Sequence, residues 1–227
     1  AFAQYTFSKL KDSPAAVATK GHYVFNGYME LKKVWFDLKN SSTLLSYLVS
    51  FFFFNMGVQT VMYAASLFGQ SELHLDSSVL ITIILIIQFV AILGAYVFSS
   101  LSRRYGNLKA LSIAIVIWIF VCVGAFLCNK KYGVDEKLMF MGLAAVVGFV
   151  MGGIQSLARS TYSKMLPETL DHASYFSFYD VCDKIGTVIG TFAFGLINAL
   201  TGSMRSSIIV LAIFFIIGLI LLLRVRR

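Results

Sequence analysis

Long apolar runs alternate with short polar segments along most of this chain. Each run has about 20 residues or more, which is enough for an α-helix to cross a hydrocarbon core of roughly 30 Å. The runs cover residues 44–69, 78–100, 108–128, 138–158, 174–199 and 204–224. The pattern predicts an all-α integral membrane protein with six transmembrane helices. The first and fifth runs contain more polar residues than the others, so we expect these two helices to line a polar interior.

Residues 1–40 differ from the rest because they are polar and of mixed charge. They contain no apolar core of a signal peptide, and we expect the chain to be part of a longer protein. Val24, Leu31 and Leu38 recur at near-helical spacing with lysines between them, which is typical of an amphipathic helix on a membrane surface. A plain linker fits the same residues equally well. The sequence therefore predicts a cytoplasmic segment over 1–40 and a six-helix unit over 41–227.

Composition and charge agree with a membrane protein. The 227 residues are 58% hydrophobic and only 13% charged, which excludes an ordinary soluble domain. The net charge of +8 is unevenly placed: fourteen Lys and Arg residues fall in segments on one side of the expected membrane and four on the other. This is the positive-inside pattern. It predicts that both chain ends are cytoplasmic, and it leaves no basic patch for nucleic acid.

Cysteine and histidine are sparse and isolated. They are Cys122, Cys128, Cys182, His22, His74 and His172. Without a CxxC motif or clustered ligands they predict neither disulfides nor a metal site, and we expect no cofactor.

Small residues recur four apart in two of the runs, as Gly148 and Gly152 and again as Gly186 and Gly190. Such spacing lets helix backbones approach closely in lipid. Close packing is the favoured interpretation, and flexing during a transport cycle is the alternative.

The fifth run contains three charges, Asp180, Asp183 and Lys184. Charge at membrane depth is costly unless it is paired or faces water, so it indicates function by default. On a helical wheel these residues share one polar stripe about 120° wide with Ser177, Thr187 and Thr191. Asp180 and Lys184 have the spacing and order of a helical ion pair. The charge of Asp183 would then be neutralised by Arg159, by a proton or by a substrate amine. The alternative is that the charges form a static network between helices.

Other runs add polar groups of the same kind. Asn55 and Gln59 lie one turn apart on the first run, Gln155 and Arg159 lie one turn apart on the fourth, and Gln88 lies on the second. Amides and a guanidinium suit a carboxylate-bearing or zwitterionic solute. We expect a substrate or coupling cavity formed by Asp180, Asp183, Lys184, Gln155, Arg159, Asn55 and Gln59.

Several stretches resemble the C-terminal half of major facilitator superfamily transporters. They are NMGVQTVMYAASLFG (55–69), IQFVAILGAYVFSSLSRRYG (87–106), GGIQSLARSTYSKMLPE (152–168) and YFSFYDVCDKIGTVIGTF (175–192). More narrowly, they are similar to the unknown-major-facilitator branch, which is related to autophagy-linked vacuolar amino-acid effluxers. The resemblance implies that the six runs are helices seven to twelve of a twelve-helix fold. The missing N-terminal half would precede Ala1 as a partner.

The resemblance also implies two inverted three-helix repeats and a central cavity with alternating access. The loop at 99–109 resembles the superfamily's G-x-x-x-D-R-x-G signature, a cytoplasmic gating loop. Arg104 and Gly106 match that signature, whereas Ser99 replaces its Gly and Arg103 replaces its Asp. The charge relay that the Asp supports is therefore not expected in the same form.

Three functional hypotheses follow. The first is a secondary transporter of small organic solutes, with amino acids as the family-level expectation and Asp183 or Asp180 as the candidate for proton coupling. The second is a non-transporting membrane scaffold or sensor. The third and least favoured is an intramembrane aspartyl enzyme, because both aspartates lie on one run rather than on two. The transporter hypothesis predicts no enzyme activity, a multi-pass location in a bacterial plasma membrane, and no transport by these 227 residues alone.

Overall fold

A computed structural model describes residues 23–71, 76–127, 136–168 and 171–225. These residues form seven α-helices joined by short connections and contain no β-strand. The helices are α2 (Tyr23–Asn40), α3 (Ser42–Ser71), α4 (Ser77–Tyr105), α5 (Asn107–Leu127), α6 (Glu136–Met165), α7 (His172–Thr201) and α8 (Met204–Arg224).

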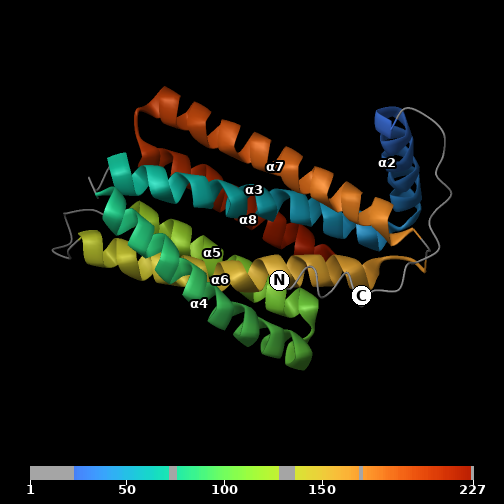
Figure 1. Cartoon of the computed structure of the whole chain (residues 1–227), viewed down its shortest axis with the longest axis horizontal. Helices are drawn as coiled ribbons and strands as arrows, with labels where there is room; N and C mark the ends of the chain where they lie inside the picture. Colours follow the sequence, from blue (N-terminus) through green and yellow to red (C-terminus); the bar gives the residue numbers. More distant parts are fainter. Residues whose placement is uncertain (1–22, 72–75, 128–135, 169–170, 226–227) are drawn as a thin grey trace.

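The six predicted transmembrane helices are confirmed as α3 to α8, since the described residues contain 6 helices long and apolar enough to cross a membrane. Several of them are longer than the apolar runs, and α6 continues through polar residues to Met165. Backbone hydrogen bonding extends a helix into the headgroup region, whereas hydropathy marks only the hydrocarbon part. Figure 1 shows the six helices lying roughly along one direction, with α2 across one end.

Two glycines with positive φ end helices at opposite ends of this bundle. Gly106 (φ 88) separates α4 from α5, and Gly202 (φ 63) separates α7 from α8. Left-handed backbone is readily adopted by glycine because it lacks a Cβ. At the start of α7 the Asp171 carboxylate accepts a hydrogen bond from the Ser174 N–H at 3.2 Å, as an N-cap does.

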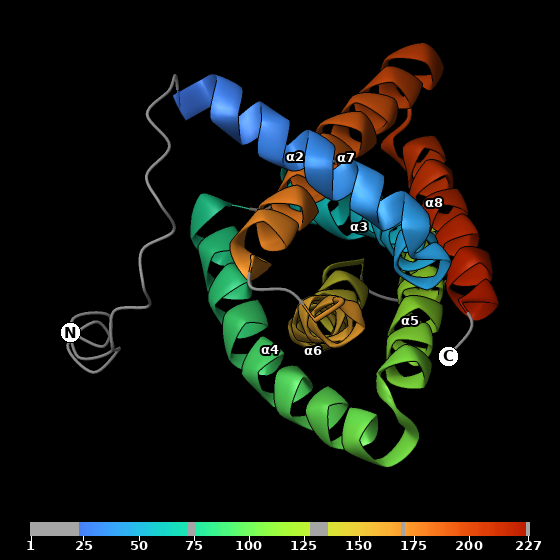
Figure 2. The same cartoon turned by 90° about the vertical axis from the view of Figure 1, so that its right-hand side faces the viewer.

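Residues 23–40 form a helix and not a linker. Helix α2 crosses the bundle end over α7 and α3 (Figure 2). Val34 and Leu38 on its inner face are buried, and the Trp35 ring stacks on Phe178 of α7 with centroids 6.0 Å apart. Tyr28 and Phe36 remain exposed, so α2 is amphipathic as the spacing indicates. Residues 1–22 lie outside the described residues.

The helix contacts repeat under exchange of the two halves of the six-helix unit. Helices α3, α4 and α5 correspond in order to α6, α7 and α8. The α4–α6 contact then corresponds to the α3–α7 contact, and the α3–α8 contact corresponds to the α5–α6 contact. All four pairs are in contact. The α5–α8 pair, which the exchange returns to itself, is also in contact. This pairing is that of two three-helix repeats forming half of a major facilitator fold.

Glycines place the α4 and α6 backbones in close contact. A Cβ on Gly148 would lie 2.8 Å from the carbonyl oxygen of Ile87, and one on Gly152 would collide with the carbonyl oxygen of Ala91. From the other side, a Cβ on Gly94 would collide with the carbonyl oxygen of Phe149. The small-residue spacing therefore serves close helix packing, the favoured interpretation of the sequence.

Candidate functional site

A polar cavity lies between α3, α6 and α7, in the half of the bundle nearer α2. Its volume is about 690 Å³. The polar residues that line it are Asn55, Gln59, Gln155, Ser156, Arg159, Ser160, Ser163, Tyr179 and Asp183. Five of the seven predicted cavity residues are thus brought together, and the other two, Asp180 and Lys184, are ion-pair partners of lining residues.

Asp183 is the best-enclosed charge of the cavity, since only 17% of its side chain is exposed. Its Oδ1 accepts hydrogen bonds from Asn55 Nδ2 at 2.8 Å and Gln59 Nε2 at 3.1 Å. Its Oδ2 lies 3.0 Å from Lys184 Nζ. Two amides one turn apart on α3 therefore hold a carboxylate of α7, and both carboxylate oxygens have a donor, as a partly buried charge requires.

A second ion pair joins α6 to α7. Arg159 Nη2 lies 2.7 Å from Asp180 Oδ1. The guanidinium carbon also lies 5.7 Å from the Tyr179 ring centroid, within cation–π range. Both charged side chains are more than half exposed, so the guanidinium has room for a further anionic partner.

This pairing corrects the prediction from helical spacing. Asp180 forms its ion pair with Arg159 and not with Lys184, and Asp183 forms its ion pair with Lys184 and not with Arg159. Arg159 reaches Asp180 from the neighbouring helix, a contact that spacing within α7 cannot reveal. Lys184 turns its long side chain to the adjacent Asp183, which the α3 amides already fix in place.

Aromatic residues form one wall of the cavity, and they are not among the residues predicted for the site. Tyr179 stacks on Phe51 with ring centroids 4.2 Å apart and lies 4.9 Å from the Tyr162 ring. The Tyr162 hydroxyl donates to the Tyr175 carbonyl oxygen at 2.8 Å, which fixes that ring. Tyr179 precedes Asp183 by four residues, so its place on the same helix face was available as a signal.

Other polar residues of the predicted stripe form hydrogen bonds within α7. Thr187 donates to the Asp183 carbonyl oxygen at 2.8 Å, Thr191 to that of Thr187 at 2.7 Å, and Ser177 to that of Ala173 at 3.0 Å. These hydroxyls therefore donate to backbone carbonyl oxygens of α7 itself and, among the described residues, not to groups of other helices. Gln155 is exposed toward the cavity, whereas Gln88 is exposed on α4 and does not line it.

The predicted gating loop lines a different hollow, which adjoins the polar cavity because Asn107 Nδ2 donates to Ser160 Oγ at 3.2 Å. Arg103, Arg104 and Gly106 line a separate hollow at the turn between α4 and α5, together with the end of α6. Among the residues that the structure describes, none lines both hollows.

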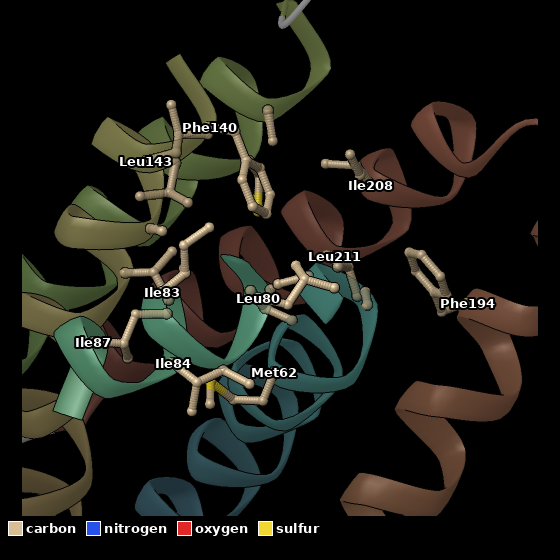
Figure 3. Close-up of a pocket in the computed structure, with 18 residues that line it drawn as sticks. Met62, Leu80, Ile83, Ile84, Ile87, Phe140, Leu143, Phe194, Ile208 and Leu211 are labelled. Atoms are coloured by element: carbon tan, nitrogen blue, oxygen red, sulfur yellow. The ribbon is translucent and has the colours of Figure 1, made fainter. Parts of the chain in front are cut away.

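A third cavity lies toward the opposite end of the bundle and is apolar (Figure 3). Its volume is about 230 Å³. Side chains from several helices converge on it, among them Met62, Ile83, Ile87, Phe140 and Leu211.

Within the described residues, no group of three His, Cys, Asp or Glu side chains is placed to hold a metal ion. Cys122 is buried and Cys182 is half-buried, and His22, His74 and Cys128 lie outside the described residues. Each cavity aspartate has its own cation, which differs from two carboxylates sharing a proton in an aspartyl enzyme. The site presents a guanidinium, a carboxylate and several amides around one cavity, an arrangement that can hydrogen-bond a zwitterion.

Comparison with known proteins gives a consistent family. Residues 1–227 match the family described as "Vacuole effluxer Atg22 like". The chain is 31% identical over 202 residues to the uncharacterized MFS-type transporter YxiO of Bacillus subtilis, covering 88% of the chain and 45% of that relative. It is 28% identical to autophagy-related protein 22 of Kluyveromyces lactis, over 89% of the chain and 42% of that relative. The chain thus spans less than half the length of these curated relatives. No solved structure matches it significantly.

Proposed function

The chain belongs to the family described as "Vacuole effluxer Atg22 like", and on that premise we propose that it forms one half of a secondary transporter of the major facilitator type. The transporter moves small organic solutes across a membrane by alternating access. We propose amino acids as the solute class. The MFS-type transporter among the relatives supports the reaction type, and the chemistry of the polar cavity supports the solute class.

The observation that carries this proposal is that opposite charges line the same cavity. Arg159 and Asp183 both line the cavity and belong to facing helices, α6 and α7. An amino acid carries a carboxylate and an ammonium group on one carbon. Arg159 would bind the carboxylate through its guanidinium fork, because Arg matches carboxylate geometry. Asp183 would receive the ammonium group, and Gln155 and Gln59 would orient the solute.

Proton coupling is proposed for Asp183. Its carboxylate is enclosed and hydrogen-bonded to two amides, so a change of its protonation alters contacts between α3 and α7. Loss of the negative charge would release Lys184 and weaken both amide bonds. Such a change links a proton to the relative position of two helices, as alternating access requires.

The test is counterflow of labelled amino acids into proteoliposomes containing the full-length protein. Asp183→Asn and Arg159→Gln should each lower the initial rate by about tenfold or more, since hydrogen bonds to charged groups are worth ~1.5–3 kcal/mol. Gln88→Leu, at an exposed position of α4 that does not line the cavity, is the matched control and should transport normally. Unchanged flux and pH dependence in both Asp183→Asn and Lys184→Met would refute the cavity assignment.

The scaffold or sensor alternative predicts a different result in the same preparation. No labelled solute would be accumulated, although solutes could still bind. The purified 227-residue chain should give no flux, because one half provides only one wall of the pathway. Robust flux from this chain alone would contradict the half-transporter proposal.

The chain is a multi-pass membrane protein, and we propose the bacterial plasma membrane as its location, with both ends cytoplasmic. The relative from Bacillus subtilis and the positive-inside pattern support this placement. A reporter that functions only in the cytoplasm should be active when it is fused after Arg227. Activity at that position of a reporter that functions only after export would contradict this orientation.

A further inference from the structure

A cationic hollow lies where α4, α5 and α6 meet at the end of the bundle that carries α2. Its volume is about 630 Å³. The polar and aromatic side chains lining it are Ser102, Arg103, Arg104, Tyr105, Asn107, Thr161 and Lys164. All three charged lining residues are cations, and the described residues place no carboxylate in the lining.

The three cations have neutral partners within the described part of the chain. Arg103 donates to the Ser100 hydroxyl at 3.2 Å, the Arg104 guanidinium lies 5.4 Å from the Tyr105 ring centroid, and Lys164 donates to Asn107 Oδ1 at 3.0 Å. These contacts orient the side chains without neutralising them. The first turn of α5 also begins in the hollow, where helical N–H groups lack acceptors within the helix. The hollow therefore favours an anion.

The hollow lies where three candidate membrane spans end, which is the level at which lipid headgroups are expected. The membrane-spanning part of α4 ends at Tyr105, that of α5 starts at Asn107, and that of α6 ends at Met165. All three ends border the hollow. Tyr105 is exposed there, and tyrosine is enriched at membrane–water interfaces.

Each arginine also continues an exposed apolar stripe of α4. Residues seven and eleven positions apart lie within about 20° of one another on a helix. Arg103 therefore shares a stripe with Tyr96 and Ile92, which are 71% and 67% exposed. Arg104 likewise shares one with Val97 and Leu93, which are also exposed. Cationic groups at the end of α4 thus lead directly onto its exposed apolar surface.

We propose that this hollow binds the phosphate of an anionic phospholipid, whose acyl chains lie along the exposed stripes of α4. The guanidinium groups of Arg103 and Arg104 and the ammonium group of Lys164 contact the headgroup. A lipid satisfies both parts of the surface, whereas a soluble phosphate would leave the apolar stripes without a role. An acidic side chain elsewhere in the full-length protein would likewise contact only the cations.

The test is lipid retention by the full-length protein, measured by native mass spectrometry after exposure to mixed phosphatidylglycerol and phosphatidylcholine. The parent should retain phosphatidylglycerol preferentially. The triple variant R103Q/R104Q/K164Q should lose this preference by roughly fivefold for each charge removed. R103K/R104K keeps the charge and should retain most of it. K32Q/K33Q/R224Q removes three basic residues of the same bundle end outside the hollow and should stay near the parent.

Three results would overturn the proposal. The first is equal phosphatidylglycerol retention by the parent and R103Q/R104Q/K164Q. The second is displacement of the lipid by millimolar inorganic phosphate added alone, which would identify a site for soluble anions. The third is an equal fall of the thermal unfolding midpoint of the triple variant in phosphatidylglycerol and phosphatidylcholine, with unchanged lipid retention. That result would indicate that the cations pair with an acidic side chain of the protein.

Discussion

The α4–α6 and α3–α7 helix pairs occupy equivalent places in the two halves of the bundle but differ in chemistry. In the α4–α6 pair, Gly94, Gly148 and Gly152 bring backbone against backbone. In the α3–α7 pair, Asn55 donates to Asp183, a side-chain contact across the helices. Close packing is not confined to the first pair, since a Cβ on Gly190 of α7 would lie 2.8 Å from the Met56 carbonyl oxygen of α3. The difference between the pairs is that α3–α7 adds a charged network to its glycine contact, whereas α4–α6 is held by close packing.

The cavities beside these pairs differ in the same way. The apolar cavity is bordered by Ile83 and Ile87 of α4 and by Phe140 of α6 (Figure 3). The polar cavity is bordered by α3, α6 and α7 and contains Asp183. The comparison indicates that substitutions in the α4–α6 pair mainly change stability, whereas substitutions in the polar network mainly change function.

The largest effect is expected at Gly152. In Gly152→Ala the new Cβ collides with the Ala91 carbonyl oxygen, which is backbone and cannot turn away. We expect the free energy of unfolding to fall by about 3 kcal/mol, the upper part of the usual range for overpacking. Thermal unfolding of the full-length protein in detergent measures it.

Two glycine controls test whether the effect depends on the close backbone contact at Gly152. A Cβ on Gly142 of the same helix meets nothing within 4 Å, and one on Gly186 in the α3–α7 pair lies 3.5 Å from the Phe52 carbonyl oxygen, an ordinary contact. Both alanine variants should stay near the parent. Equal stability of Gly152→Ala and Gly142→Ala would remove the distinction between the two pairs.

A smaller loss is expected at Asn55, which is buried and donates to Asp183 at 2.8 Å. Asn55→Leu leaves that carboxylate with one amide donor fewer. The unfolding free energy should fall by about 1–3 kcal/mol, the usual penalty for leaving a buried polar group under-satisfied. The reference is Gln88→Leu, which replaces an exposed amide on α4 and should not lower the unfolding midpoint. A stability loss in Asn55→Leu no larger than in this reference would mean that the network does not hold α3 to α7.

The smallest effect on stability is expected for the Arg159–Asp180 pair, because both side chains are more than half exposed. A double-mutant cycle with Arg159→Met and Asp180→Asn should give a coupling energy of about 0.2–1 kcal/mol, as for exposed ion pairs. The coupling should weaken further as salt is added. A coupling above about 2 kcal/mol that salt does not change would instead make this pair a structural element equivalent to the glycine contacts.

Much of the fold could be predicted because hydropathy in a membrane protein is a strong signal. Every apolar run became a helix, and the glycines four apart on α6 lie at the α4–α6 contact. The ion pairs could not be predicted, because Arg159 and Asp180 meet only through the packing of α6 on α7. The aromatic wall around Tyr179 was missed because an aromatic residue in an apolar run does not stand out by hydropathy, and only its four-residue spacing from Asp183 indicated the shared helix face.

The sequence by itself determined the class of the protein, the number of membrane helices and the polar face of α7. These properties depend on local composition and on the helical repeat, which a chain in a bilayer must obey because every backbone polar group needs an internal partner. Only the tertiary structure decided which charge meets which. It placed Asn55 and Gln59 on Asp183, turned Arg159 to Asp180, and gathered Arg103, Arg104 and Lys164 around one hollow. Long side chains reach several neighbours, and the packing of the helices determines which of them is within reach.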